Sequence, residues 1–186
     1  MANIIIVIDM LRGFHDLGNL TNPRMADIIP NVKNLLERKT SEDWKTSFLA
    51  DNHQPDDLEF QTFPPHCVVG TKEIEVVDEL KQFVTAENYL PKTRYSGFYK
   101  TDLEGILVQE NPEKVIVVGV CTDICVLHTT SDLRNRDYDV IIPRDCVETY
   151  DAPEHPAEEI NHWAFVHIEN IWGARVIKKQ EEIEND

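Results

Sequence analysis

A single stretch near the middle of the chain restricts the fold most strongly. It begins with the apolar, β-branched run at residues 115–118, and a segment with the composition of a helix follows from about residue 122 to 134. Such a run is typical of a strand that is buried on both faces of a parallel sheet. Gly119 interrupts the run, so Cys125 falls in the first helical turn after the strand. Ligands bind at the carboxyl ends of the strands in open α/β sheets, which makes Cys125 a candidate site residue.

The rest of the chain repeats this alternation of strands and helices. Further strands are predicted at 4–8, 45–50, 90–92, 140–142 and 174–177, and further helices at 24–39, 73–83, 101–109 and 157–170. Pro30 should either kink the first of these helices or mark its true start. The alternation predicts a three-layer α/β/α fold with a mainly parallel, doubly wound sheet. We expect one domain over residues 1–186, with an acidic tail at 179–186 that frays.

The charge of the chain narrows the class of partner. The sequence has 34 acidic and 18 basic residues, for a net charge of −16. Nucleic acids bind to patches of Lys and Arg, and anionic membranes repel an acidic chain, so neither partner is expected. No apolar run approaches the roughly 20 residues of a membrane span, and no basic secretory signal begins the chain. We expect a cytoplasmic protein whose four cysteines are reduced.

Reactive residues stand at or just beyond the ends of several predicted strands: Asp9, Asp51, Lys92 and Cys125. These ends share one edge of a parallel sheet, so residues that are distant in sequence can converge there. A thiol nucleophile needs a base, while an ammonium keeps a carboxylate ionised and stabilises a thiolate. Asp9, Lys92 and Cys125 are therefore a candidate catalytic set. Taken singly, they also fit a turn residue, a surface lysine and a small buried residue.

A second group consists of two carboxylates and two imidazoles: Asp51, His53, Glu59 and His66. Asp51 and His53 lie two residues apart at a strand end, so they share one face. Two imidazoles with two carboxylates suit one divalent ion such as zinc, manganese or iron. The spacing leaves the third ligand open, because Asp56 and Asp57 are alternatives to Glu59. An Asp-x-His pair by itself is also common in hydrogen-bonded turns.

Five ordered segments carry a resemblance to a known family. They are IVIDMLRGF at 6–14, Asp51-x-His53, FPPHCVVGT at 63–71, KTRYSGF at 92–98 and GVCTDICV at 119–126. In this order they resemble the isochorismatase-like cysteine hydrolase superfamily, and within it the nicotinamidases (pyrazinamidases). The resemblance extends from residue 4 to about residue 177.

The resemblance implies an amidohydrolase that converts nicotinamide, and amides such as pyrazinamide, to the acid and ammonia in NAD salvage. Cys125 would attack the amide carbonyl, Asp9 would accept the thiol proton and pass it to ammonia, and Lys92 would hold both. Water would then hydrolyse the thioester. The backbone N–H groups of Cys121 and Cys125 would form the oxyanion hole. The Val120–Cys121 peptide bond is expected to be cis.

The resemblance also assigns the contacts of a small pyridine carboxamide. One divalent ion, held by Asp51, His53, Glu59 and His66, would bind the ring nitrogen and position the substrate. The spacing from Glu59 to His66 resembles the branch that uses a glutamate ligand. The residues implied to contact the substrate are Phe14, Phe63, Tyr95, Val120 and Cys121, although the aromatic ones also fit an ordinary core. A homo-oligomer is compatible with this reading.

Two rival interpretations stay open. Amidases of the N-carbamoylsarcosine and ureidoacrylate types resemble this chain in Asp9, Lys92 and Cys125 but generally lack the metal-binding group. The second rival is a non-catalytic, metal-stabilised binding protein on the same fold, because a fold does not determine a function. The intact catalytic set argues against it. Cys67 and Cys146 match no catalytic position and are expected to pack in the core.

Overall fold

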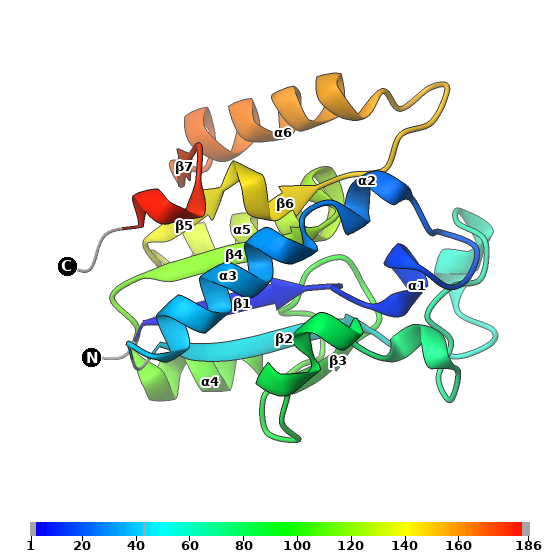
Figure 1. Cartoon of the computed structure of the whole chain (residues 1–186), viewed down its shortest axis with the longest axis horizontal. Helices are drawn as coiled ribbons and strands as arrows, with labels where there is room; N and C mark the ends of the chain where they lie inside the picture. The colour runs from blue at the N-terminus through cyan, green and yellow to red at the C-terminus, as the bar shows by residue number, and fades with distance from the viewer. Residues whose placement is uncertain (1–2, 43, 184–186) are drawn as a thin grey trace.

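The computed structural model describes residues 3–42 and 44–183, which contain seven parallel strands (Figure 1). They are β1 (Ile4–Ile8), β2 (Lys45–Asp51), β3 (Tyr89–Lys92), β4 (Val115–Val120), β5 (Val140–Pro143), β6 (Val147–Glu148) and β7 (Arg175–Ile177). The strand order is β3-β2-β1-β4-β5-β7, and the short β6 pairs with the end of β4. The parallel sheet confirms the predicted fold class, whereas β6 was not predicted.

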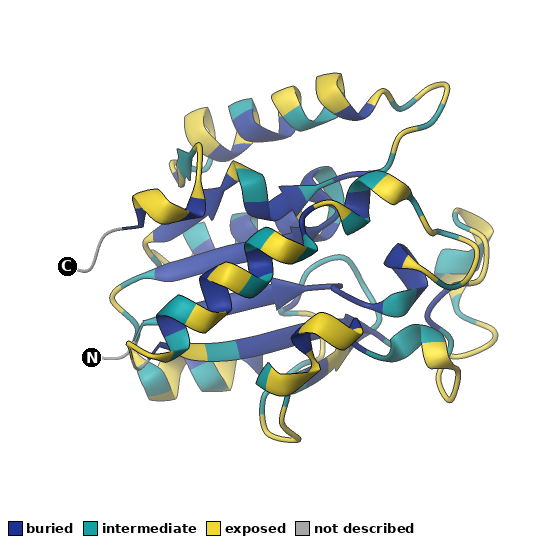
Figure 2. Ribbon diagram, viewed as in Figure 1, coloured by how far each residue is buried: buried dark blue, intermediate teal, exposed yellow. Residues whose placement is uncertain are grey.

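Helices cover both faces of the sheet. They are α1 (Arg12–His15), α2 (Pro23–Ala26), α3 (Ile29–Thr40), α4 (Leu103–Glu110), α5 (Leu127–Arg134) and α6 (Ala157–Asn170). Alternate residues of β1 face opposite sides, so Ile5 packs in the same cluster as α3 and Ile6 in the same cluster as α4, α5 and α6. Figure 2 shows the result, with the inner surfaces of the strands and helices buried.

Three predicted helices differ from those observed. The predicted helix 24–39 is two helices, α2 and α3, and Pro30 stands in the first turn of the second, where no N–H is missed. The helix predicted at 73–83 is wrong, since two 3₁₀ segments, η2 (Lys72–Ile74) and η3 (Asp78–Phe83), replace it. The helix predicted at 122–134 begins with a π-helical turn, η4 (Thr122–Val126), which continues into α5.

The predicted fraying of the tail at 179–186 is wrong for its described part. Residues Gln180–Glu182 form a 3₁₀ turn, η6, in which Gln180 is fully buried. Arg38 donates a hydrogen bond to the Gln180 carbonyl at 2.8 Å, and Ile183 packs in the core beneath α3. The acidic composition of the tail concealed these two anchoring residues. Residues 184–186 lie outside the described residues.

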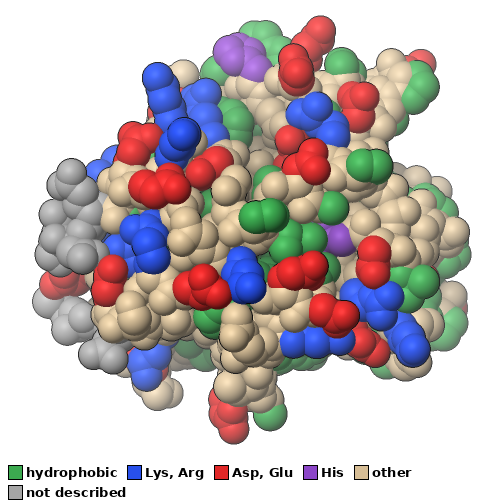
Figure 3. Space-filling view, viewed as in Figure 1, with side chains coloured by type: hydrophobic (Ala, Val, Ile, Leu, Met, Phe, Trp, Pro, Cys, Tyr) green, Lys and Arg blue, Asp and Glu red, His purple; other side chains and the backbone are tan. Residues whose placement is uncertain are grey.

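The surface carries charges of both signs. On the face shown in Figure 3, Lys and Arg side chains are interspersed with Asp and Glu side chains. Among residues 3–42 and 44–183, no helix is both long enough and apolar enough to cross a bilayer. The four cysteines are buried and free of disulfides, as expected.

Candidate active site

The site lies where the direction of strand addition reverses. The chain passes from the central β1 outward to β2 and β3, and then crosses to β4 on the other side of β1. Loops that leave β1 and β4 therefore separate, and a crevice opens at their carboxyl ends. Ile8 is in register with Gly119, so Asp9 and Cys121 follow neighbouring strands at this edge. Asp51 pairs in register with Lys92 at the ends of β2 and β3.

The three predicted catalytic side chains meet in this crevice. Lys92 Nζ lies 2.8 Å from Asp9 Oδ2 and 3.4 Å from Cys125 Sγ. The Asp51 backbone N–H donates to Asp9 Oδ1 at 2.9 Å, which fixes the carboxylate. Asp9 and Lys92 are 1% exposed and Cys125 is 6% exposed, so protein groups rather than water determine their charge states.

Burial determines where the proton of this set resides. Burial and the Asp51 carboxylate raise the pKa of Asp9 to about 6, although the Lys92 ammonium opposes the shift. Burial also raises the pKa of the Cys125 thiol well above its usual value, despite the ammonium beside it. The thiol, and not the thiolate, is therefore the resting form of Cys125. At neutral pH a protonated sulfur faces a mostly ionised Asp9, with a carboxylate oxygen within 4.8 Å to accept its proton.

The turn that carries the nucleophile starts at Cys121. The Val120–Cys121 peptide bond is cis, as expected. The carbonyl of Cys121 accepts hydrogen bonds from the N–H groups of Ile124 and Val126, both at 3.1 Å. These bonds stabilise the turn between Cys121 and Cys125, and both residues line the crevice. Their backbone N–H groups are the predicted oxyanion donors.

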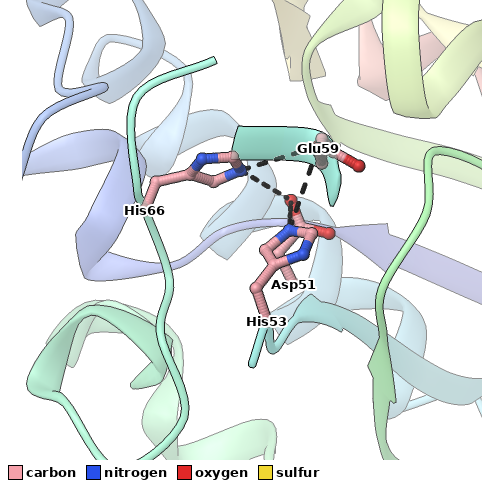
Figure 4. A group of neighbouring side chains, drawn as sticks. All are labelled: Asp51, His53, Glu59 and His66. Atoms are coloured by element: carbon pink, nitrogen blue, oxygen red, sulfur yellow. Dashed lines mark ion pairs between the residues drawn. The ribbon is translucent and has the colours of Figure 1, made fainter. Parts of the chain in front are cut away.

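The four predicted metal ligands also converge (Figure 4). His53 Nε2 lies 3.6 Å from Asp51 Oδ2 and 3.9 Å from Glu59 Oε1. His66 Nε2 lies 3.7 Å from each of the same two oxygens. Bonds of about 2.0–2.1 Å in tetrahedral geometry would place ligand atoms about 3.4 Å apart, which is close to the observed spacing.

The hydrogen bonds of this group fit a metal ion. Nδ1 of His66 lies 2.9 Å from the carbonyl oxygen of Pro64, which can only accept a hydrogen bond. Nδ1 therefore carries the hydrogen, and Nε2 of His66 has a free lone pair. His53 Nε2 and Glu59 Oε2 are buried and have no hydrogen-bond partner among the described residues. Unpaired buried lone pairs are costly, and a divalent cation would satisfy them. The donor set suits a divalent ion such as zinc, manganese or iron.

Among the alternatives for the third ligand, Glu59 is the residue that joins the group. Asp56 is exposed, and Asp57 faces Nδ1 of His53 at 3.2 Å, on the side of the ring opposite the ligand atom. Asp51 links the two groups of the site, because its Oδ1 lies 2.5 Å from Lys92 Nζ. Burial alone would raise the pKa of Asp51, but the Lys92 ammonium and the imidazoles hold it well below its usual range.

One cavity of about 280 Å³ connects the thiol to the four-ligand group. Of the predicted substrate contacts, Phe14, Phe63, Tyr95 and Cys121 line it. Val120 was predicted wrongly, since it is fully buried in the sheet and does not line the cavity. Seven further lining residues were not predicted from the sequence: Asn19, Leu20, Thr21, Asn22, Met25, Ile124 and Tyr150. The aperiodic stretch after β1 could have identified the first four, because loops at this edge commonly bind ligands.

A buried thiol, carboxylate and ammonium at the switch point of a parallel sheet define an α/β protein equipped for catalysis by a cysteine nucleophile. The sequence pattern of the Isochorismatase domain matches residues 3–166. The chain therefore belongs to the isochorismatase family.

Solved structures from this family match nearly the whole chain. Nicotinamidase PncA from Bacillus subtilis is 32% identical with a TM-score of 0.84, covering 96% of this chain and all of that one. N-carbamoylsarcosine amidase from Thermoplasma acidophilum is 29% identical with a TM-score of 0.84 and full coverage of both chains. Pyrazinamidase of Pyrococcus horikoshii in complex with zinc is 26% identical with a TM-score of 0.82, covering 96% and 99%.

Proposed function

We propose that the protein is a nicotinamidase, a metal-dependent amidohydrolase that converts nicotinamide to nicotinate and ammonia in cytoplasmic NAD salvage. One observation carries the proposal, namely that a four-ligand group and a buried cysteine nucleophile open into the same small cavity. The lining offers aromatic side chains that can pack against a flat ring and a thiol that can attack the amide carbon. The volume of the cavity suits a small ligand. The similarity to a nicotinamidase and to a zinc-bound pyrazinamidase supports it.

The residues of the chain account for the chemistry in two stages. Asp9 accepts the proton of the Cys125 thiol as Sγ forms a bond to the amide carbon. The oxyanion that results accepts hydrogen bonds from the backbone N–H groups of Cys121 and Cys125. The C–N bond then breaks and Asp9 returns the proton to the leaving ammonia, which leaves a thioester. In the second stage Asp9 takes a proton from a water molecule as the water oxygen attacks the thioester carbon. The C–S bond then breaks as the acid forms, and Asp9 returns the proton to Sγ, which restores the thiol.

Lys92 and the metal ligands position these reactants. The Lys92 ammonium lies between the carboxylates of Asp9 and Asp51 and stabilises the negative charge as it moves between oxygen and sulfur. A divalent ion held by Asp51, His53, Glu59 and His66 would supply a Lewis-acid site for the pyridine nitrogen. Phe14, Phe63 and Tyr95 supply apolar surface for the two faces of the ring.

A second candidate is an amidase of the N-carbamoylsarcosine type, which the equally strong match to the Thermoplasma enzyme favours. Such a substrate is linear and has no aromatic nitrogen for a metal ion. It would use Asp9, Lys92 and Cys125 in the same way but would leave the four-ligand group without a role. The two candidates therefore differ in whether turnover depends on the ion.

Ammonia release from nicotinamide, N-carbamoylsarcosine and ureidoacrylate separates the candidates. We expect turnover of nicotinamide, at least about 10³-fold loss in Cys125→Ala, and no comparable loss in Cys146→Ala, whose thiol lies in the core away from the cavity. Chelation should abolish nicotinamide turnover, and zinc, manganese or iron should restore it. Faster turnover of N-carbamoylsarcosine that is unaffected by the chelator would reject the nicotinamidase in favour of the second candidate.

A further inference from the structure

The Asp57 carboxylate lies next to the four-ligand group, on the side of His53 away from the other ligands, and it has three partners. Its side chain is 8% exposed, and its oxygens contact His53, Glu59 and Arg94. The first two of these residues are candidate metal ligands, and the third is the only cation that pairs with Asp57 among the described residues. Asp57 can therefore orient two candidate metal ligands without being a ligand itself.

The contact with His53 determines which ring nitrogen faces the other ligands. Asp57 Oδ2 lies 3.2 Å from His53 Nδ1, and an ionised carboxylate can only accept a hydrogen bond. Nδ1 therefore carries the hydrogen, and the lone pair is on Nε2, which points toward Asp51 and Glu59 (Figure 4). A carboxylate on the far nitrogen also makes an imidazole a stronger metal ligand.

The contact with Glu59 fixes a second ligand through its backbone. Asp57 Oδ1 accepts a hydrogen bond from the Glu59 N–H at 2.9 Å, and it thereby caps the 3₁₀ segment η1 (Leu58–Gln61). The cap sets where this turn begins, so it sets where the Glu59 side chain leaves the backbone. One carboxylate consequently orients two of the four ligands, one by its side chain and one by its main chain.

Arg94 holds Asp57 in this position. Arg94 Nη1 lies 2.9 Å and 3.1 Å from the two carboxylate oxygens, and it also donates to the Thr93 carbonyl. Arg94 follows Lys92 by two residues, so this pair fastens the loop of the metal ligands to the end of β3. The positive charge keeps the carboxylate ionised in its nearly enclosed position.

We infer that Asp57 is a positioning residue that sets the affinity of the metal site by orienting His53 and Glu59, and that Arg94 supports it. This inference rests on the metal site of the proposed function. It assigns Asp57 a role other than the ligand role that the sequence had left open.

Zinc affinity of the folded, metal-free protein tests the inference without any assay of activity. Competition with a chromophoric chelator gives the dissociation constant for wild type, Asp57→Asn and the matched control Asp56→Asn. Asn keeps the shape and an oxygen for the Glu59 N–H but removes the charged acceptor at His53. We expect zinc binding to weaken about 10- to 100-fold in D57N and to stay within twofold of wild type in D56N, because Asp56 is exposed and is not part of the four-ligand group.

A second variant and a spectrum keep the outcomes distinct. Arg94→Gln should weaken zinc binding less than D57N, and cobalt substituted into D57N should show a shifted visible absorption relative to cobalt in wild type. If wild type fails to bind zinc or cobalt, the metal site of the proposed function is wrong. If wild type binds zinc and both D57N and R94Q bind it within twofold of wild type, the metal site stands and the role of Asp57 is rejected.

Discussion

His15 is a buried histidine that the catalytic residues do not use. It lies in α1 beside Phe14, is 8% exposed, and its ring nitrogens make no well-aligned hydrogen bond among the described residues. Burial lowers its pKa from 6.5 to about 4. The unfolded chain thus binds a proton between these two values and the folded chain does not. The neutral ring stabilises the fold fully above about pH 6.5, and this stabilisation is lost as the pH falls toward 4.

The pH dependence of stability should report this residue directly. Between about pH 7 and pH 5, wild type should lose about 2 kcal/mol more of its unfolding free energy than His15→Leu, which has no proton to gain. Urea denaturation of both proteins at the two pH values measures the difference. Parallel losses in the two proteins would show that the folded protein protonates this ring as readily as the unfolded chain does, so that its pKa is not lowered.

At the scale of single elements, Gly119 decides how closely β4 approaches β1. Its φ is +116°, and a Cβ at this position would lie 1.9 Å from the carbonyl oxygen of Ile8. Both the conformation and the space therefore require glycine. The close approach sets Cys121 beside Asp9, so the geometry of the crevice begins with this residue.

Two glycine substitutions should change stability in opposite directions. Gly119→Ala should destabilise the protein by at least about 2 kcal/mol, through the backbone clash and the unfavourable φ. Gly105→Ala, in α4 with nothing within 4 Å of the added carbon, should stabilise it by about 0.5–1 kcal/mol. Chemical denaturation measures both, and a G119A protein as stable as wild type would contradict the role of the close approach.

The sequence predicted the elements whose pattern is local and missed those that depend on distant partners. Continuous β-branched runs identified β1 and β4, and the polar residues Asp9, Asp51 and Lys92 at the ends of β1, β2 and β3 indicated the position of the site. The helix expected at 73–83 failed because Val76 forms an antiparallel bridge with Leu11, a contact that no local pattern reveals. Val120 was misplaced because adjacency to Cys121 does not tell which way a side chain points.

At the scale of the whole molecule, the C-terminal segment completes the core on one face of the sheet. Ile183 is 4% exposed and packs in the same cluster as β1 and α3. The Gln180 N–H donates to Asp145 Oδ1 at 2.9 Å, which fastens the turn to the segment after β5. Burial of Ile183 and the hydrogen bonds of Gln180 together explain why the described part of this acidic segment packs against the core.

Two isoleucines near the end of the chain should therefore differ in their contribution to stability. Ile183→Ala should cost about 2–4 kcal/mol of unfolding free energy, because it removes buried carbon and leaves a cavity. Ile171→Ala, whose side chain is 64% exposed, should change it by less than about 0.5 kcal/mol. Thermal or urea denaturation measures both variants. If the two substitutions changed the unfolding free energy equally, Ile183 would not contribute to the core.

Asp51 offers one oxygen to the Lys92 ammonium and the other to the imidazoles. Among the described residues, the site around it holds three carboxylates, Asp9, Asp51 and Glu59, and the single ammonium of Lys92. With all three ionised, the excess of two negative charges is one that a divalent cation would neutralise. In the proposed metal site, the charge of a bound ion would therefore act through Asp51 and Lys92 on the sulfur of Cys125. Exchange of a bound divalent ion for one of different charge would then also change the acidity of the Cys125 thiol.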